Sequence, residues 1–132
     1  MDFFAMNLTP QQANEINMLA LAHVGDAAYE LMVRTMLCAN GHFPVSELHK
    51  KTVSRVNAAA QATSAEKILP ALTEDELRIY KRGRNTKVHS VPHNAEVSQY
   101  HAATGLEALL GWLYLQGKTQ RLNQLFSLMT EE

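Results

Sequence analysis

The chain has 132 residues, 46% of them hydrophobic, and this length fits one domain that buries roughly two thirds of the surface exposed by its unfolded form. Its 12 lysines and arginines against 13 acidic residues give a net charge of −1, which argues against a generic polyanion-binding domain with a large basic excess. We expect a single domain over residues 1–132 in a reducing cytoplasm, without a signal peptide or a membrane-spanning helix. The single cysteine, Cys38, lies in an apolar stretch and is expected to pack as a small hydrophobe.

Apolar residues recur at helical spacing, without the alternation typical of strands, so the sequence predicts an all-α bundle of about six helices. Thr9 is expected to cap a first helix that begins at Pro10. A second helix should cover residues 17–39 and end before an Asn-Gly pair. Ser46 is expected to cap a third helix, which carries apolar residues as far as Ala60.

The C-terminal half is predicted to hold one long loop and three further helices. Thr73 begins a fourth helix with a capping box, and this helix should end near Gly83. An exposed loop then runs from Arg84 to about Asn94. Asn94 is expected to cap a long fifth helix, and Gly117 separates that helix from a final amphipathic one.

The first candidate for chemistry is Asp26, a lone carboxylate that follows Gly25 in an otherwise apolar helical stretch. A buried ionised carboxylate is costly unless it is paired or bound to metal. Because glycine inside a helix costs about 1 kcal/mol relative to alanine, we expect something to approach the backbone closely at Gly25. The alternative is a salt bridge from Asp26 to Arg34 or Arg55, with Gly25 merely permitting helix packing.

Glu107 is a second lone carboxylate in an apolar helical run with glycines close by. If Asp26 and Glu107 converge across the bundle, their oxygens could hold a hard cation such as Mg²⁺. The spacing in sequence does not establish that they converge, and a solvated Glu107, or one that pairs with the basic loop, is the alternative. Glu30 lies one turn beyond Asp26 on the same face, where it could bind the same ion or repel Asp26 unless an arginine intervenes, and we expect it to support the site without binding the ion directly. The six histidines form no HExxH pattern, and the only HxxxH spacing, His89 to His93, falls in the expected loop and not on a helix, which leaves a zinc site with little support.

Four of the 12 basic residues fall within residues 81–87, which we call the basic segment. Arginine makes forked contacts with phosphate and glycine lets a backbone come close, so this segment could follow a nucleic-acid strand. The expected contacts come from Lys81, Arg82, Arg84, Asn85 and Lys87. The alternative is a basic helix C-terminus that complements the helix macrodipole.

Taken together, these features resemble the catalytic domain of ribonuclease III. They resemble more closely the Mini-ribonuclease III family, which is that domain without a double-stranded-RNA-binding domain. The resemblance covers nearly the whole chain. It rests on four motifs in the same order: LALAHVGDA at 19–27, LHKK at 48–51, KRGRN at 81–85 and EALLGWLYL at 107–115.

The resemblance implies that Asp26 is the aspartate of the ribonuclease III signature and that Glu107 binds magnesium opposite it. Leu19 and Ala22 stand where full-length ribonuclease III has signature glutamates, and Thr104 stands at the aspartate three residues before Glu107. With fewer carboxylates, we expect one firmly held Mg²⁺ ion, for which Mn²⁺ can substitute, and further ions brought by RNA phosphates.

The implied function is a magnesium-dependent endoribonuclease that cuts double-stranded RNA and leaves 5'-phosphate and 3'-hydroxyl ends. A symmetric homodimer would place one site on each strand of the duplex. The resemblance points to the precursor of large-subunit (23S) ribosomal RNA as the substrate, with a ribosomal protein as helper. The alternative is a noncatalytic RNA-binding or ribosome-assembly module with the same fold. A helical nucleotide pyrophosphohydrolase is disfavoured because clustered acids such as ExxE are missing.

Overall fold

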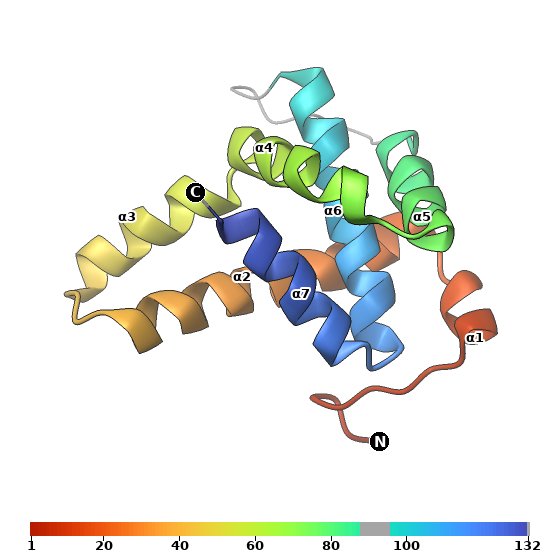
Figure 1. Ribbon diagram of the computed structural model, residues 1–132, viewed down its shortest axis with the longest axis horizontal. Coiled ribbons are helices and arrows are strands. Elements are labelled where there is room, and N and C mark those ends of the chain that lie inside the picture. Colours follow the sequence, from red (N-terminus) through yellow and green to blue (C-terminus); the bar gives the residue numbers. More distant parts are fainter. Residues whose placement is uncertain (88–95, 132) are drawn as a thin grey trace.

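The structure is a computed structural model that describes residues 1–87 and 96–131. Within these ranges the chain forms seven α-helices, one 3-10 turn and no strand, which confirms the predicted all-α class (Figure 1). The elements are α1 (Pro10–Asn14), α2 (Met18–Asn40), α3 (Val45–Val56), α4 (Ala58–Ile68), η1 (Leu69–Ala71), α5 (Glu74–Arg84), α6 (Val97–Leu115) and α7 (Thr119–Thr130). In the described part of the chain, none of the helices is both long and apolar enough to span a bilayer.

Helix α6 lies at the centre of the bundle, with α2, α4, α5 and α7 packed around it (Figure 1). Leu106, Ala108, Leu109 and Leu110 are consecutive or nearly consecutive on α6, and all four are fully buried. A helix that is apolar on every side is stable only when neighbours cover all of its faces. The apolar run around Glu107 therefore places this residue in the middle of the protein.

The predicted helix starts are confirmed at three positions. Thr9 and Thr73 each form a capping box, in which the threonine hydroxyl accepts from a backbone N–H three residues later. The side chain of Asn17 caps α2 by accepting from the Ala20 N–H at 2.8 Å. The predicted cap of the fifth helix, Asn94, lies outside the described residues.

The predicted third helix is in fact two helices, and Ser46 does not cap it. Helix α3 begins directly after Pro44. Asn57 has extended backbone angles, and its side chain accepts from the Ala60 N–H at 2.9 Å and donates to the Val53 carbonyl at 3.0 Å. One asparagine thus ends α3 and begins α4, which is why the structure has seven helices where about six were predicted.

The second half of α2 and all of α3 form an arm that extends away from the bundle (Figure 1). The prediction for Cys38 is wrong, because this residue is exposed on the arm. It borders a groove of about 220 Å³ between α2 and α3. Large apolar side chains are also exposed on the arm: Leu31, Val45 and Val53.

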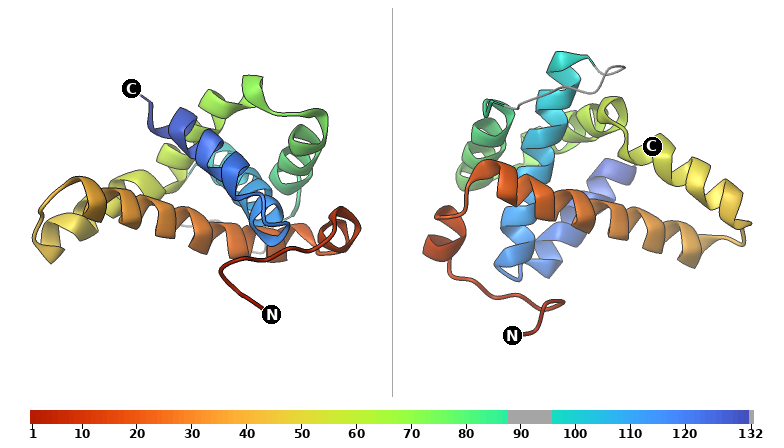
Figure 2. Two further views of the ribbon diagram at one scale, coloured as in Figure 1. Left: turned by 60° about the horizontal axis from the view of Figure 1, so that its bottom comes forward. Right: turned by 180° about the vertical axis from the view of Figure 1, so that it is seen from behind.

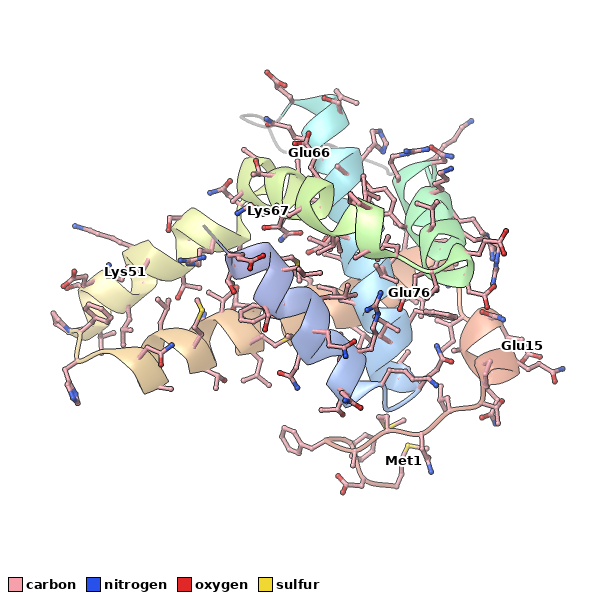
Figure 3. The ribbon with its side chains drawn as sticks, in the orientation of Figure 1. Met1, Glu15, Lys51, Glu66, Lys67 and Glu76 are labelled. Atoms are coloured by element: carbon pink, nitrogen blue, oxygen red, sulfur yellow. The ribbon has the colours of Figure 1, made fainter. Side chains whose placement is uncertain are left out.

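A buried ion pair joins α5 to α7. Glu76 is only 4% exposed, and its side chain lies on the inner side of α5 (Figure 3). The Arg121 guanidinium donates to both Glu76 carboxylate oxygens, at 2.8 and 2.9 Å, and also to the Ala71 carbonyl. Burial opposes the ionisation of Glu76, but the hydrogen bonds from Arg121 and Thr73 outweigh it and lower the pKa of Glu76.

Candidate active site

Helices α2 and α6 cross (Figure 2). At the crossing their backbones are in direct contact at two glycines. A Cβ atom added to Gly25 would lie 1.7 Å from the backbone oxygen of Glu107. One added to Gly111 would lie 1.9 Å from the backbone oxygen of Leu21. Neither position can hold a side chain without moving a helix. The expected close approach at Gly25 is therefore confirmed, and the approaching element is α6.

The crossing brings the two predicted carboxylates together, although they are far apart in the sequence. Asp26 follows Gly25 on α2, while Glu107 supplies the carbonyl that touches Gly25. Burial and the adjacent Asp26 carboxylate raise the pKa of Glu107 to about 8. Two carboxylates held this close repel each other. The repulsion is relieved when a cation binds between them or when one of them is protonated.

The burial of the two acids differs from the prediction. Asp26 is exposed, so the expectation of a buried carboxylate at this position is wrong, and it is Glu107 that is partly buried. The predicted alternative for Asp26 was a salt bridge to Arg34 or Arg55. Over the ranges that the structure describes, Asp26 forms no ion pair, and Arg34 binds Glu30 at 2.9 Å.

Sequence reasoning missed a third polar side chain at the site, Gln61 of α4. It is 2% exposed, its amide nitrogen donates to the Val56 carbonyl at 2.9 Å, and the same amide faces the Glu107 carboxylate and favours its ionised form. The available signal was a lone long polar residue in the stretch AAAQATSA at 58–65. A glutamine in such a stretch is ordinarily assigned to a solvated helix face.

The donor atoms at this crossing are all oxygens that suit a hard cation. Asp26 and Glu107 offer carboxylates, and Gln61 offers an amide oxygen without a hydrogen-bond partner among the described residues. No three or more His, Cys, Asp or Glu residues gather as a metal site in the described part of the chain. The set fits an ion such as Mg²⁺, which commonly takes one or two protein carboxylates and completes its shell with water and substrate phosphates.

The basic segment packs against the stretch of α6 that carries Glu107. A Cβ on Gly83 would lie 2.8 Å from the Ala108 Cβ, and one on Gly105 would lie 2.7 Å from the Tyr80 backbone oxygen, so α5 and α6 also touch through glycine. This contact accounts for a glycine at position 105.

Within the basic segment, Lys81, Arg82, Asn85 and Lys87 are exposed, while Arg84 is half-buried. The Arg84 guanidinium lies 5.8 Å from the centre of the Tyr80 ring and donates to the Asn85 side chain at 3.2 Å. Lys81, Arg82 and Arg84 stand in the last turn of α5, where the macrodipole also favours cations. The RNA contacts of this segment therefore remain a prediction.

Comparisons with a family model and with known proteins all point to the same family. The family model of the Ribonuclease III domain matches residues 19–118. A protein named Mini-ribonuclease 3 from Thermoanaerobacter sp. (strain X514) is 44% identical over 94% of this chain and 87% of its own length. The Mini-ribonuclease 3 of Clostridium tetani is 39% identical over 96% of this chain and 85% of its own length.

A solved structure from Fusobacterium nucleatum superposes with a TM-score of 0.78 at 32% identity, and the match covers 86% of this chain and 90% of that one. The sequence matches and the shared fold therefore agree across most of the chain. The chain belongs to the Mini-ribonuclease III branch of the ribonuclease III family, whose members are endoribonucleases that act on double-stranded RNA.

Proposed function

We propose that this endoribonuclease hydrolyses double-stranded RNA with a Mg²⁺ ion held by Asp26 and Glu107, for which Mn²⁺ can substitute. The products would carry 5'-phosphate and 3'-hydroxyl ends. The observation that carries the proposal is the meeting of these two carboxylates at a helix crossing where only glycine fits. The chemistry of the donor set supports a hard, oxygen-seeking ion.

The two acids have different tasks in this scheme. Glu107 is partly buried on the central helix, which fixes its carboxylate, while Asp26 is exposed and leaves one side of the site open to a phosphate group. When bound, Mg²⁺ supplies a Lewis acid that activates water and neutralises charge on the scissile phosphate. The chain itself contributes a fixed spacing between two carboxylates on different helices.

The exposed cations of the basic segment are proposed to bind RNA phosphates. Lys81, Arg82, Asn85 and Lys87 are open to solvent, and Arg84 is held by its contacts with Tyr80 and Asn85. Proteins read double-stranded RNA mainly through shape, phosphates and 2'-hydroxyls, so this segment would add affinity with little sequence preference.

We also propose that two copies form a symmetric homodimer, so that each strand of the duplex meets one site. The arm supports this, because it carries exposed apolar side chains and a groove between α2 and α3. Size-exclusion chromatography with light scattering should give twice the chain mass of 14.7 kDa. A mass of one chain would contradict the dimer.

The proposed substrate is the precursor of large-subunit (23S) ribosomal RNA in the cytoplasm, cut with the help of a ribosomal protein. Its support is the resemblance to Mini-ribonuclease III. Mapping of 23S RNA ends in cells that lack the protein should reveal unprocessed termini. Mature termini in those cells would rule out this substrate.

The decisive test of the catalytic proposal is cleavage of duplex RNA with and without Mg²⁺. Asp26→Asn should abolish cleavage while folding and RNA binding are retained, because the side-chain shape is kept and only the charge is lost. Asp75→Asn is the matched control, because it makes the same chemical change at an exposed aspartate of α5 that pairs with Arg78, so cleavage should persist. Wild-type protein that binds duplex RNA without cutting it in Mg²⁺ would instead identify a noncatalytic RNA-binding or ribosome-assembly module.

A further inference from the structure

Gln61 is an unusual residue for the interior of a helical bundle. Its neighbours on α4 include Ala65 and Ile68, which are 1% and 0% exposed, and Gln61 itself is 2% exposed. A buried amide is costly unless each of its polar atoms finds a partner. The partners of this amide therefore indicate what the residue does.

The Gln61 amide has two N–H donors and one oxygen acceptor. The nitrogen donates to the Val56 carbonyl at 2.9 Å and also faces the Glu107 carboxylate. Val56 is the last residue of α3, and its carbonyl has no intrahelical donor. The amide cannot turn over, because its oxygen would then face the oxygens of Val56 and Glu107. The orientation of the amide is thus fixed by its surroundings.

This orientation leaves the Gln61 oxygen buried and without a donor among the described residues. The side chains beside it, Glu107 and through it Asp26, are acceptors as well when ionised. The side chains of Asp26 on α2 and Gln61 on α4 therefore both meet the Glu107 carboxylate of α6. A cluster of acceptors of this kind is satisfied by a cation together with the water molecules that the cation orders.

We propose that Gln61 is a positioning residue of the metal site. Its amide nitrogen holds the Glu107 carboxylate in place, and its amide oxygen accepts a hydrogen bond from a water molecule in the shell of the bound ion. This inference rests on the proposed function, because it assigns Gln61 to the ion held by Asp26 and Glu107. Groups around a metal site that orient its direct ligands commonly change metal affinity by about 10–100-fold when they are removed.

Metal binding by the intact protein tests the inference without reliance on activity. Mn²⁺ is titrated into wild type and variants by isothermal calorimetry, and the Mn²⁺-induced shift in melting temperature is recorded in parallel. Gln61→Leu keeps the side chain large but removes both polar atoms, so Mn²⁺ affinity should fall about 10–100-fold. RNA cleavage by this variant should recover at high Mg²⁺ with an unchanged KM for RNA. A residue with only a packing role would leave both metal measurements unchanged.

Two further variants make the result decisive. Gln61→Glu places a charged oxygen at the same point, so it should bind Mn²⁺ more tightly than wild type while melting at a lower temperature in EDTA. Ser64→Ala is the matched control, since Ser64 is also buried on α4 and should bind Mn²⁺ as wild type does. If Gln61→Leu does not fold, the Mn²⁺ affinity of Gln61→Glu alone tests the inference.

Wild-type Mn²⁺ affinity in either Gln61 variant overturns the inference. If Asp26→Asn abolishes Mn²⁺ binding in the same experiment, the proposed metal site stands and only the role of Gln61 is lost. If Asp26→Asn also binds Mn²⁺ as wild type does, the metal site itself is misplaced and both proposals fall together.

Discussion

The crossing of α2 and α6 makes a strong prediction for the substitution Gly25→Ala. The new Cβ would start 1.7 Å from the Glu107 backbone oxygen, whereas real Cβ contacts essentially never lie below 3.0 Å. Overpacking of a core costs about 1–3 kcal/mol, and this site lies at the upper end because the atoms that the new Cβ would meet, in Glu107 and Gly111, belong to the helix backbone. The higher helix propensity of alanine offsets about 1 kcal/mol of this loss. We expect a net loss of about 2 kcal/mol in the free energy of unfolding, or roughly 5–10 °C in melting temperature.

The same substitution should impair catalysis beyond its effect on stability. Moving α2 off α6 separates Asp26 from Glu107, because the first residue follows Gly25 and the second supplies the contacted carbonyl. A misplacement of about 1 Å can cost on the order of 100-fold in rate. The assay is duplex RNA cleavage at a temperature where circular dichroism shows the variant to be fully folded, with Mn²⁺ affinity measured alongside.

Gly83→Ala provides the matched comparison, because it makes the same chemical change where α5 meets α6. Its Cβ would lie 2.8 Å from the Ala108 Cβ, so the required displacement is much smaller. Helix α5 carries neither Asp26 nor Glu107, and Mn²⁺ affinity should therefore remain near the wild-type value. The reasoning is refuted if Gly25→Ala melts and cleaves like wild type, or if Gly83→Ala loses as much metal affinity.

Three further predictions concern charge. In EDTA, wild-type stability should fall as pH rises from 4.5 towards 8, because burial and the neighbouring carboxylate raise the pKa of Glu107 to about 8 and the folded chain holds a proton that the unfolded chain releases. Glu107→Gln should remove this slope in thermal melts, and a slope that persists would assign it elsewhere. Arg121→Met leaves the buried carboxylate of Glu76 without its ion-pair partner, and the free energy of unfolding measured in urea should fall by about 2–4 kcal/mol. Arg78→Met at an exposed pair should cost less than about 1 kcal/mol, and equal losses would contradict this account. Arg82→Glu should weaken RNA binding and flatten its dependence on salt, whereas an unchanged slope would place the RNA path elsewhere.

Local rules predicted the parts of the fold that are decided locally. The Thr73 capping box and the start of α2 follow from contacts within four residues, so the sequence alone was sufficient. The break at Asn57 was missed because apolar residues keep helical spacing across it, and asparagine caps a helix only when the chain turns there. The exposure of Asp26 was also misjudged, since apolar neighbours in sequence do not establish that a neighbouring helix covers that side.

The candidate site was only partly predictable, because helical periodicity relates residues on one helix and says nothing of which helices cross. Gly25 indicated a close approach, but only the fold shows that the approaching backbone is that of α6 at Glu107 and Gly111. For the same reason Gln61 could not be connected with Glu107, since their contact depends on how α4 lies across α6.

The glycine crossing also explains how a site with few acids can be well defined. Each residue advances a helix by about 1.5 Å, so a slip of α2 by one turn would carry Asp26 about 5.4 Å along the α2 axis and away from Glu107. Backbone contact at Gly25 and Gly111 resists such a slip, because every other residue on these faces bears a Cβ that would collide. The separation of the two carboxylates is therefore set by main-chain packing and does not depend on additional acidic side chains. It follows that substitutions at the two glycines should disturb metal binding although neither residue has a side chain to offer a ligand.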